Sequence, residues 1–142
     1  METVIDKVAW TLIVDRKILM VRPKGKDYFI NPGGKREKKP DGEWESDEEV
    51  LIREVMQELL VTPLRPFIFD GPFKGRVRDK KDTFVIDRCY RSAGYAGRLT
   101  LGAELLGGEM HLFRRDEYVG QTFATNTGEL ILNHYQQADL ID

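Results

Sequence analysis

The most informative segment is residues 45–61, which reads Glu-Ser-Asp-Glu-Glu-Val-Leu-Ile-Arg-Glu-Val-Met-Gln-Glu-Leu-Leu-Val. Ser46 is followed three residues later by Glu49, and this capping-box pattern predicts that a helix starts there. Pro63 predicts its end, because proline disfavours helical conformation in the residue before it. Helical periodicity gives the segment an apolar stripe, which we expect to face the core. Its members are Leu51, Ile52, Val55, Met56, Leu59 and Leu60.

The opposite stripe of this helix is polar and contains Asp47, Glu54, Gln57 and Glu58. Two carboxylates at i and i+4 are neighbours on a helix surface and repel each other. A divalent cation reverses the sign of that interaction, and Mg²⁺ takes one or two protein carboxylates while water and substrate phosphates complete its shell. A plain solvated helix face has the same spacing, so the spacing alone fits both interpretations.

The rest of the chain alternates short apolar runs with turn residues. We expect strands at residues 8–14, 18–21, 28–30, 67–73, 83–91, 99–101 and 110–113. A second helix is expected to open at Asn126, which is followed at the third position by Glu129. The order of strands, helix, strands, helix predicts a mixed β-sheet flanked by helices, in a single domain over residues 1–142.

Composition excludes several classes of protein. The chain has 142 residues, 41% hydrophobic and 32% charged, with a net charge of −2. This charge gives no overall field that would attract nucleic acid, so we expect no nucleic-acid partner. No apolar run approaches the roughly 20 residues of a membrane span, and no signal peptide is recognised. With the single cysteine Cys89, these features predict a cytoplasmic protein without a membrane partner.

Charges are nevertheless sorted along the sequence. Acidic residues predominate in residues 41–58, whereas residues 74–81 carry five basic side chains and one acidic one. An acidic cluster beside a basic loop is what a site for a metal and a polyphosphate requires. Two separate solvated faces would give the same pattern.

The segment from Pro32-Gly33-Gly34-Lys35 to Val61 resembles the signature of the Nudix hydrolases. The family pattern is Gly, five residues, Glu, seven residues, Arg-Glu, a hydrophobic residue, any residue, Glu-Glu, any residue, Gly and a hydrophobic residue. Here seven residues separate Glu45 from Arg53-Glu54, and Val55, Glu58 and Val61 are in register. The resemblance implies the α/β/α sandwich of that family.

The sequence departs from the family pattern in three places. The gap between Gly34 and Glu45 is five residues longer than in the pattern, which we interpret as a loop insertion. Gln57 replaces the first glutamate of the Glu-Glu pair and removes one charge from the proposed cluster. Leu60 replaces the late glycine and suggests a different exit from the helix.

The resemblance also implies an activity and the residues that perform it. The activity is metal-dependent hydrolysis of a diphosphate linkage in a nucleoside diphosphate derivative. Glu54 and Glu58 would hold Mg²⁺ or Mn²⁺ with the backbone carbonyl of Gly33, and Arg53 would orient the carboxylates by pairing with Glu45. Glu104, with Glu109 as second choice, would be the further glutamate that a loop brings to the site.

Substrate contacts are expected from residues outside the signature. Arg76 and Arg78 could hold phosphates, although a basic turn between strands explains them more simply. Asn126 could read a base or simply cap its helix, and Trp44 could stack on a base. The expected partner is a small nucleotide-type molecule, and a homodimer is compatible with the sequence. The alternative function is a Nudix-fold module that binds nucleotides or regulates, with weak or no turnover.

Overall fold

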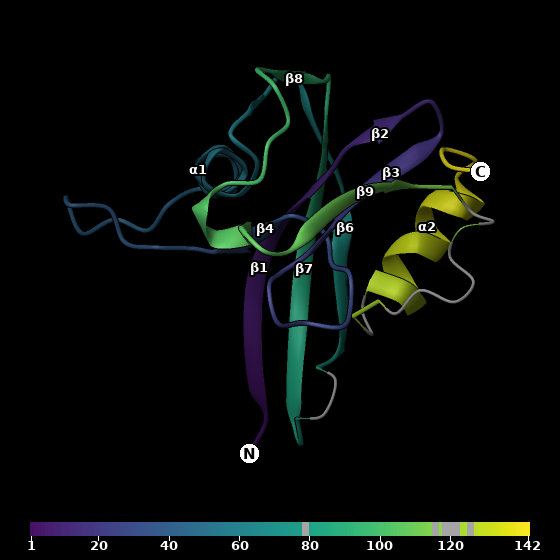
Figure 1. Ribbon diagram of the computed structural model, residues 1–142. Helices are drawn as coiled ribbons and strands as arrows, with labels where there is room; N and C mark the ends of the chain where they lie inside the picture. Colours follow the sequence, from purple (N-terminus) through teal and green to yellow (C-terminus); the bar gives the residue numbers. More distant parts are fainter. Residues whose placement is uncertain (78–79, 115–116, 118–122, 125–126) are drawn as a thin grey trace.

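Helical segments cover the two sides of a β-structure in the computed structural model (Figure 1). The structure describes all residues except 78–79, 115–116, 118–122 and 125–126, so the predictions for Arg78 and Asn126 lie outside the described residues. Helix α1 (Asp47–Leu59) packs on one side. On the other side, the π-helical turn η3 (Thr127–Ile131) continues into α2 (Leu132–Gln137).

The strands form a mixed sheet and two smaller antiparallel sheets. They are β1 (Thr3–Thr11), β2 (Ile13–Val14), β3 (Lys17–Arg22), β4 (Gly33–Lys35), β5 (Thr62–Pro63), β6 (Phe67–Arg76), β7 (Thr83–Ser92), β8 (Tyr95–Ala96) and β9 (Glu109–Phe113). The main sheet has the order β4-β1-β7-β6, and the others are β2-β3-β9 and β5-β8. Strands β1 and β7 are parallel, whereas β1–β4 and β6–β7 are antiparallel. The predicted mixed sheet between helices is therefore confirmed.

Two apolar cores lie on the two faces of the main sheet. Because side chains alternate along a strand, Val8 and Trp10 of β1 join the core beneath α1, whereas Ala9 joins the core beneath α2. Tyr135 of α2 is fully buried, and its hydroxyl hydrogen bonds to Thr11 Oγ1 of β1 at 2.9 Å. Within the described residues, no helix has the length and apolar character needed to cross a membrane.

Several predicted strands differ from the observed ones. Residues 28–30 form isolated bridges, in which Phe29 pairs with Phe123 and Ile30 with Val21. Residues 99–101 form no strand, because the backbone N–H of Thr100 donates instead to the carbonyl of Leu59 at the end of α1. Strand β6 extends to Arg76, so the basic segment expected to be a loop begins as a strand.

The ends of α1 follow the sequence signals. Ser46 is the N-cap and forms the expected capping box with Glu49. Leu60 is the C-cap, in the left-handed conformation with φ 59°. The different helix exit expected from Leu60 is therefore wrong, because this leucine adopts a conformation that glycine adopts at lower cost.

The direction in which α1 faces differs from the prediction. The buried residues are Val50, Leu51, Val55, Glu58 and Leu59. Met56 is 43% exposed and Leu60 is 47% exposed, so these two do not belong to the core face. The helix thus turns part of its polar stripe toward the protein, because β4 and residues 97–105 pack against that side.

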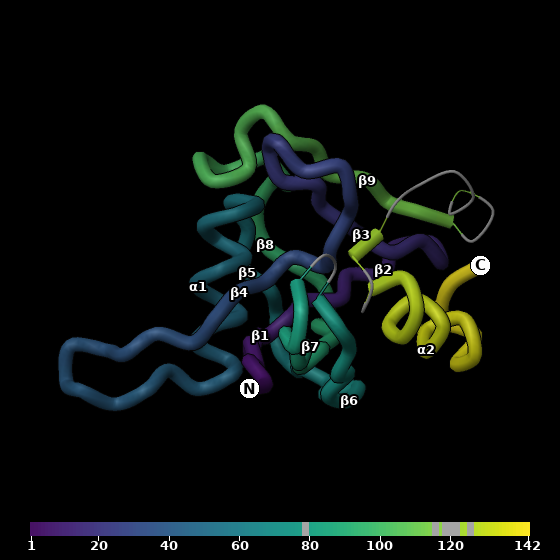
Figure 2. Tube along the Cα trace, turned by 90° about the horizontal axis from the view of Figure 1, so that it is seen from below, coloured from purple at the N-terminus to yellow at the C-terminus, as the bar shows by residue number. Residues whose placement is uncertain are grey.

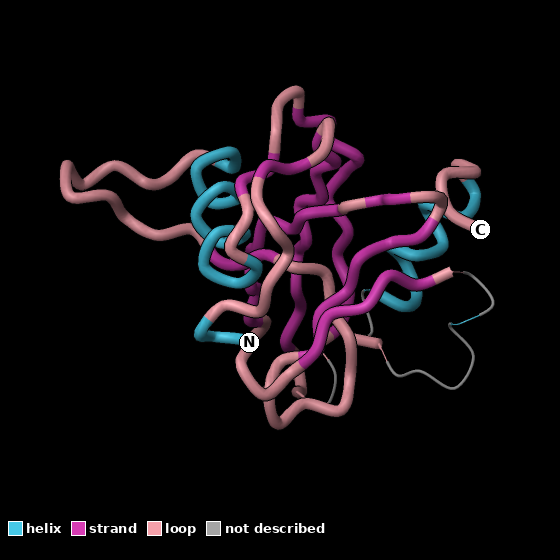
Figure 3. Tube along the Cα trace, turned by 45° about the horizontal axis from the view of Figure 1, so that its top comes forward, coloured by secondary structure: helices cyan, strands magenta, loops and turns pink. Residues whose placement is uncertain are grey.

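The inserted residues form an arm that projects beyond α1 (Figures 2 and 3). Its two sides are joined by backbone hydrogen bonds from Lys39 to Glu43 and from Glu45 to Glu37. At its base, the Lys38 ammonium lies 5.3 Å from the ring centroid of Trp44. The arm is therefore a hairpin-like extension beside α1, and Lys39 connects it to that helix through an ion pair with Glu49.

Candidate functional site

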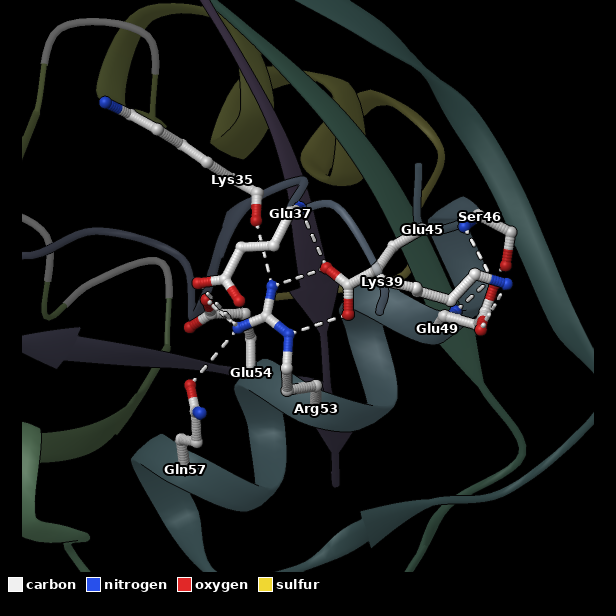
Figure 4. Close-up of polar contacts among 9 residues, drawn as sticks. All are labelled: Lys35, Glu37, Lys39, Glu45, Ser46, Glu49, Arg53, Glu54 and Gln57. Atoms are coloured by element: carbon white, nitrogen blue, oxygen red, sulfur yellow. Dashed lines mark hydrogen bonds and ion pairs between the residues drawn. The ribbon is translucent and has the colours of Figure 1, made fainter. Parts of the chain in front are cut away.

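Arg53 is the centre of a polar cluster between α1 and the base of the arm (Figure 4). Its Nε and Nη2 donate to both oxygens of Glu45 at 2.8 and 2.7 Å, in a bidentate pair. Its Nη1 donates to Glu54 Oε1 at 2.8 Å, and Nη2 also donates to the carbonyl of Lys35 at 3.0 Å. The expected Arg53–Glu45 pair is thus confirmed, and it ties the end of the arm to the helix.

The Arg53–Glu45 pair is electrostatically firm. Hydrogen bonds from Arg53 hold the pKa of Glu45 below its ordinary value despite burial, and the backbone N–H of Glu37 donates to the same carboxylate at 2.9 Å. Hydrogen bonding to Glu45 also raises the pKa of Arg53. Both groups therefore stay charged throughout the ordinary pH range.

Glu58 is a buried carboxyl at the contact between α1 and β4. Glu58 is only 6% exposed, and its Oε1 accepts a hydrogen bond from the Gly33 N–H at 2.8 Å. Burial raises its pKa to about 8; the Gly33 hydrogen bond opposes this shift, and the charges of Glu54 and Glu104 add to it. The contact that the structure records is thus with the amide of Gly33, whereas the predicted role of the Gly33 carbonyl stays a prediction.

Glu54 lies one helical turn before Glu58 and packs on Gly34. A Cβ on Gly34 would lie 2.3 Å from the carboxyl carbon of Glu54, so any larger residue there would displace this carboxyl. Burial raises the pKa of Glu54, and its hydrogen bond with Arg53 opposes that shift. The Gly33-Gly34 pair thus allows two carboxylates to approach the backbone of β4.

A third carboxylate comes from the short 3-10 turn η1 (Ala103–Leu105). Glu104 lies in this turn, and its charge contributes to the raised pKa values of both Glu54 and Glu58. The turn is fixed to α1 because the Gly102 N–H donates to the Glu58 carbonyl at 2.7 Å. Glu109, the second choice, forms an ion pair with Arg22 at 2.8 Å instead. The structure therefore favours Glu104.

Gln57 points toward Arg53. Its Oε1 accepts a hydrogen bond from Arg53 Nη1 at 3.3 Å. Within the described residues, no three His, Cys, Asp or Glu side chains already lie close enough together to hold a metal ion. A cation at this site would therefore have two protein carboxylates, Glu54 and Glu58, with Glu104 as a third only after it moves closer.

A cavity of about 310 Å³ lies on the α2 side of the main sheet, and Lys35 connects it to this cluster, because Lys35 lines the cavity and its carbonyl accepts a hydrogen bond from Arg53. Its described lining is Ile5, Lys7, Asp27, Tyr28, Ile30, Asn31, Lys35, Arg76, Val77, Val85, Asp87, Ala124 and Thr127. Arg76 is thus at the cavity, as a substrate contact would require. Trp44 is 59% exposed on the arm and is outside this lining, so its proposed stacking on a base has no support from the cavity.

Asn31 is a cavity residue that the sequence did not single out. It is 5% exposed, and Thr127 Oγ1 donates to its Oδ1 at 3.2 Å. Its Nδ2 is buried and has no hydrogen-bond partner among the described residues. A buried donor without a partner typically costs about 1–3 kcal/mol. Its position two residues before Gly33 was the only available signal.

Comparison with known proteins gives structural matches only. No family model and no curated protein matches the sequence. The solution structure of the E. coli ORF135 protein is similar with a TM-score of 0.69 and 20% identity, over 99% of this chain and 96% of that chain. A MutT protein from Methanosarcina mazei Go1 has a TM-score of 0.71 and 18% identity, over 96% of each chain.

A third structure, the MutT NUDIX hydrolase from Burkholderia pseudomallei, has a TM-score of 0.69 and 16% identity, over 89% of this chain and 95% of that chain. All three similarities extend over most of the chain. They agree with the mixed sheet and the two flanking helical segments described above. The chain therefore has the fold of the MutT-like Nudix hydrolases.

Proposed function

We propose that this protein is a nucleotide pyrophosphohydrolase: a hydrolase dependent on Mg²⁺ or Mn²⁺ that cleaves a diphosphate linkage in a nucleoside diphosphate derivative. The observation that carries the proposal is the burial of Glu58 on a helix that leaves Met56 and Leu60 exposed. Glutamate is among the residues least often buried without a partner, whereas methionine and leucine are among the most often buried. Local rules of this kind are broken most often at functional sites.

The carboxylate cluster fits a divalent cation. Glu58 lies near the charges of Glu54 and Glu104, which disfavour its ionised form. Mg²⁺ needs only one or two protein carboxylates when substrate phosphates and water complete its shell. Glu54 and Glu58 would supply these two ligands. When bound there, the cation would neutralise phosphate charge and lower the pKa of a bound water.

The residues around the two ligands have distinct roles in this proposal. Arg53 positions the Glu54 carboxyl and anchors the arm through Glu45. Glu104 accepts the proton of the attacking water as the water oxygen bonds to phosphorus and the bridging P–O bond breaks. Arg76 at the cavity would hold a phosphate. Most of the rate enhancement would come from positioning and electrostatic stabilisation.

A substrate panel tests the proposal. Nucleoside triphosphates, nucleotide sugars and dinucleotide polyphosphates are incubated with the protein and Mg²⁺ or Mn²⁺, and the released phosphates are measured. We expect hydrolysis that EDTA abolishes and that Glu54→Gln lowers by at least about 100-fold. Glu48→Gln, on the same helix but paired with Arg65, is the control and should retain activity. Metal-independent turnover, or an active Glu54→Gln variant, would contradict the proposal.

A binding or regulatory module remains the second candidate. The observation that favours it is that Arg53 donates hydrogen bonds to both Gln57 and Glu54. Of the two proposed metal ligands on α1, Glu54 is therefore already paired with an arginine, and Glu58 is the one that is not. The same panel separates the two candidates. Tight nucleotide binding without hydrolysis under any metal condition would identify the module.

A further inference from the structure

Two lysines face each other across neighbouring strands at the cavity. Lys7 of β1 and Lys35 of β4 are direct register partners in the antiparallel pair, and both line the cavity. Like charges directly opposite each other in a sheet are destabilising. The sheet therefore contains a repulsive pair at the position where the cavity meets the carboxylate cluster.

Neither ammonium forms a contact ion pair with a residue that the structure describes. Among the described residues, no carboxylate lies within 4.0 Å of Lys7 Nζ or Lys35 Nζ. Figure 4 shows the Lys35 ammonium directed away from the carboxylates around Arg53. Asp87 is the partner of Lys7 in β7, and it lies on the side away from Lys35. The described lining of the cavity contains three cationic side chains and two carboxylates, Asp27 and Asp87.

Each of the two cavity lysines is also linked to the carboxylate cluster. Lys7 is close enough to Glu58 to oppose the rise of its pKa. The carbonyl of Lys35 accepts a hydrogen bond from Arg53, and Lys35 follows Gly33 and Gly34 along β4. An anion bound by the two ammonium groups would thus lie at the cavity, on the strands that connect it to the carboxylates.

We propose that Lys7, together with Lys35, is the positioning residue for the phosphate attached to the group that occupies the cavity. This inference rests on the proposed function and specifies the orientation of the ligand in the site. The nucleoside part lies in the cavity beside Asn31, its own phosphate lies between the lysines, and the scissile bond lies on the carboxylate side. Hydrolysis then leaves a nucleoside monophosphate bound by the cavity and the lysine pair.

The test measures binding without metal and without turnover. The four ribonucleoside monophosphates and the four parent nucleosides are titrated into the protein in EDTA by calorimetry. We expect at least one monophosphate to bind more tightly than its nucleoside, by about 10-fold or more, because charge-assisted hydrogen bonds to the phosphate add to the affinity. Lys7→Met should remove most of this ratio, Lys7→Arg should keep it, and added salt should reduce it.

Lys17→Met is the matched control, because Lys17 is also a half-buried strand lysine but lies in β3, away from the cavity lining. It should leave the ratio unchanged. If Lys7 has only a structural role, Lys7→Met should lower the melting temperature but leave the affinity ratio intact, and that result would overturn the inference. A ratio of one in the wild-type protein would overturn it as well. If no substrate is hydrolysed but the ratio depends on Lys7, the proposed hydrolysis fails and the phosphate site stands.

Discussion

Replacing Glu58 with glutamine isolates the charge of the buried carboxyl from its shape. The variant keeps an oxygen that can accept the Gly33 hydrogen bond, which is 2.8 Å long in the structure. The variant removes the ionisable proton of the carboxyl group. Burial, with a further contribution from the charge of Glu54, raises the pKa of Glu58 from 4.5 to about 8.

The sign of the pH effect follows from this shift. Between pH 4.5 and 8, folded Glu58 retains a proton that the unfolded chain has lost, so the stability of the metal-free protein falls as pH rises. Each pH unit in that window costs about 1.4 kcal/mol, which gives about 3 kcal/mol at pH 7 relative to acid conditions. The loss levels off above pH 8, where both states are ionised.

Urea unfolding in EDTA at pH 5, 6, 7 and 8 measures this contribution directly. The free energy of unfolding of Glu58→Gln should depend less on pH than that of the wild type, by about 3 kcal/mol between pH 5 and 8. Added Mg²⁺ should stabilise the wild type at pH 8 but not the variant, and the variant should have lost Mg²⁺-dependent hydrolysis. Glu48→Gln is the control for charge removal on α1. Equal pH dependence in Glu58→Gln and wild type, or wild-type turnover in the variant, would refute the reasoning.

Three further substitutions probe the same region. Gly34→Ala introduces a Cβ 2.3 Å from the carboxyl carbon of Glu54, so the Mg²⁺ concentration for half-maximal activity should rise roughly tenfold; a metal titration checks this. Leu60→Gly removes a left-handed leucine with φ 59°, and the free energy of unfolding should rise by about 0.5–1 kcal/mol in urea titrations. Gln57→Glu should compete with Glu54 for Arg53 and so release Glu54 for metal, and activity should then need less Mg²⁺; an unchanged Mg²⁺ dependence would contradict this.

The features predictable from the sequence are those that depend on local chemistry. The ends of α1 follow from the Ser46–Glu49 capping box and from Pro63, because capping and proline act on neighbouring residues. The Arg53–Glu45 pair was predictable from the family spacing, although the inserted arm lengthens the segment between Gly34 and Glu45. An insertion in a loop changes the chain length between two sites without changing the packing of either.

The features that could not be predicted depend on contacts between distant segments. The rotation of α1 is set by β4 and by the turn at Gly102, where a Cβ would lie 1.9 Å from the carbonyl oxygen of Gln57. Periodicity identifies an apolar stripe but not which edge of it the rest of the chain will cover. The opposition of Lys7 and Lys35 likewise exists only through the register of β1 with β4, which is 28 residues away in sequence and has only three residues.

The carboxylates around Arg53 outnumber its single positive charge. Glu37, Glu45 and Glu54 surround the single guanidinium of Arg53, which leaves this side of the site negative even before Glu58 is counted. A divalent cation next to Glu54 and Glu58 would balance that excess. The phosphates would then lie between this cation and the ammonium groups at the cavity, with positive charge on both sides of them. Removing either positive side should weaken binding of the diphosphate, but only loss of the cation should abolish its cleavage, because the lysines do not activate water.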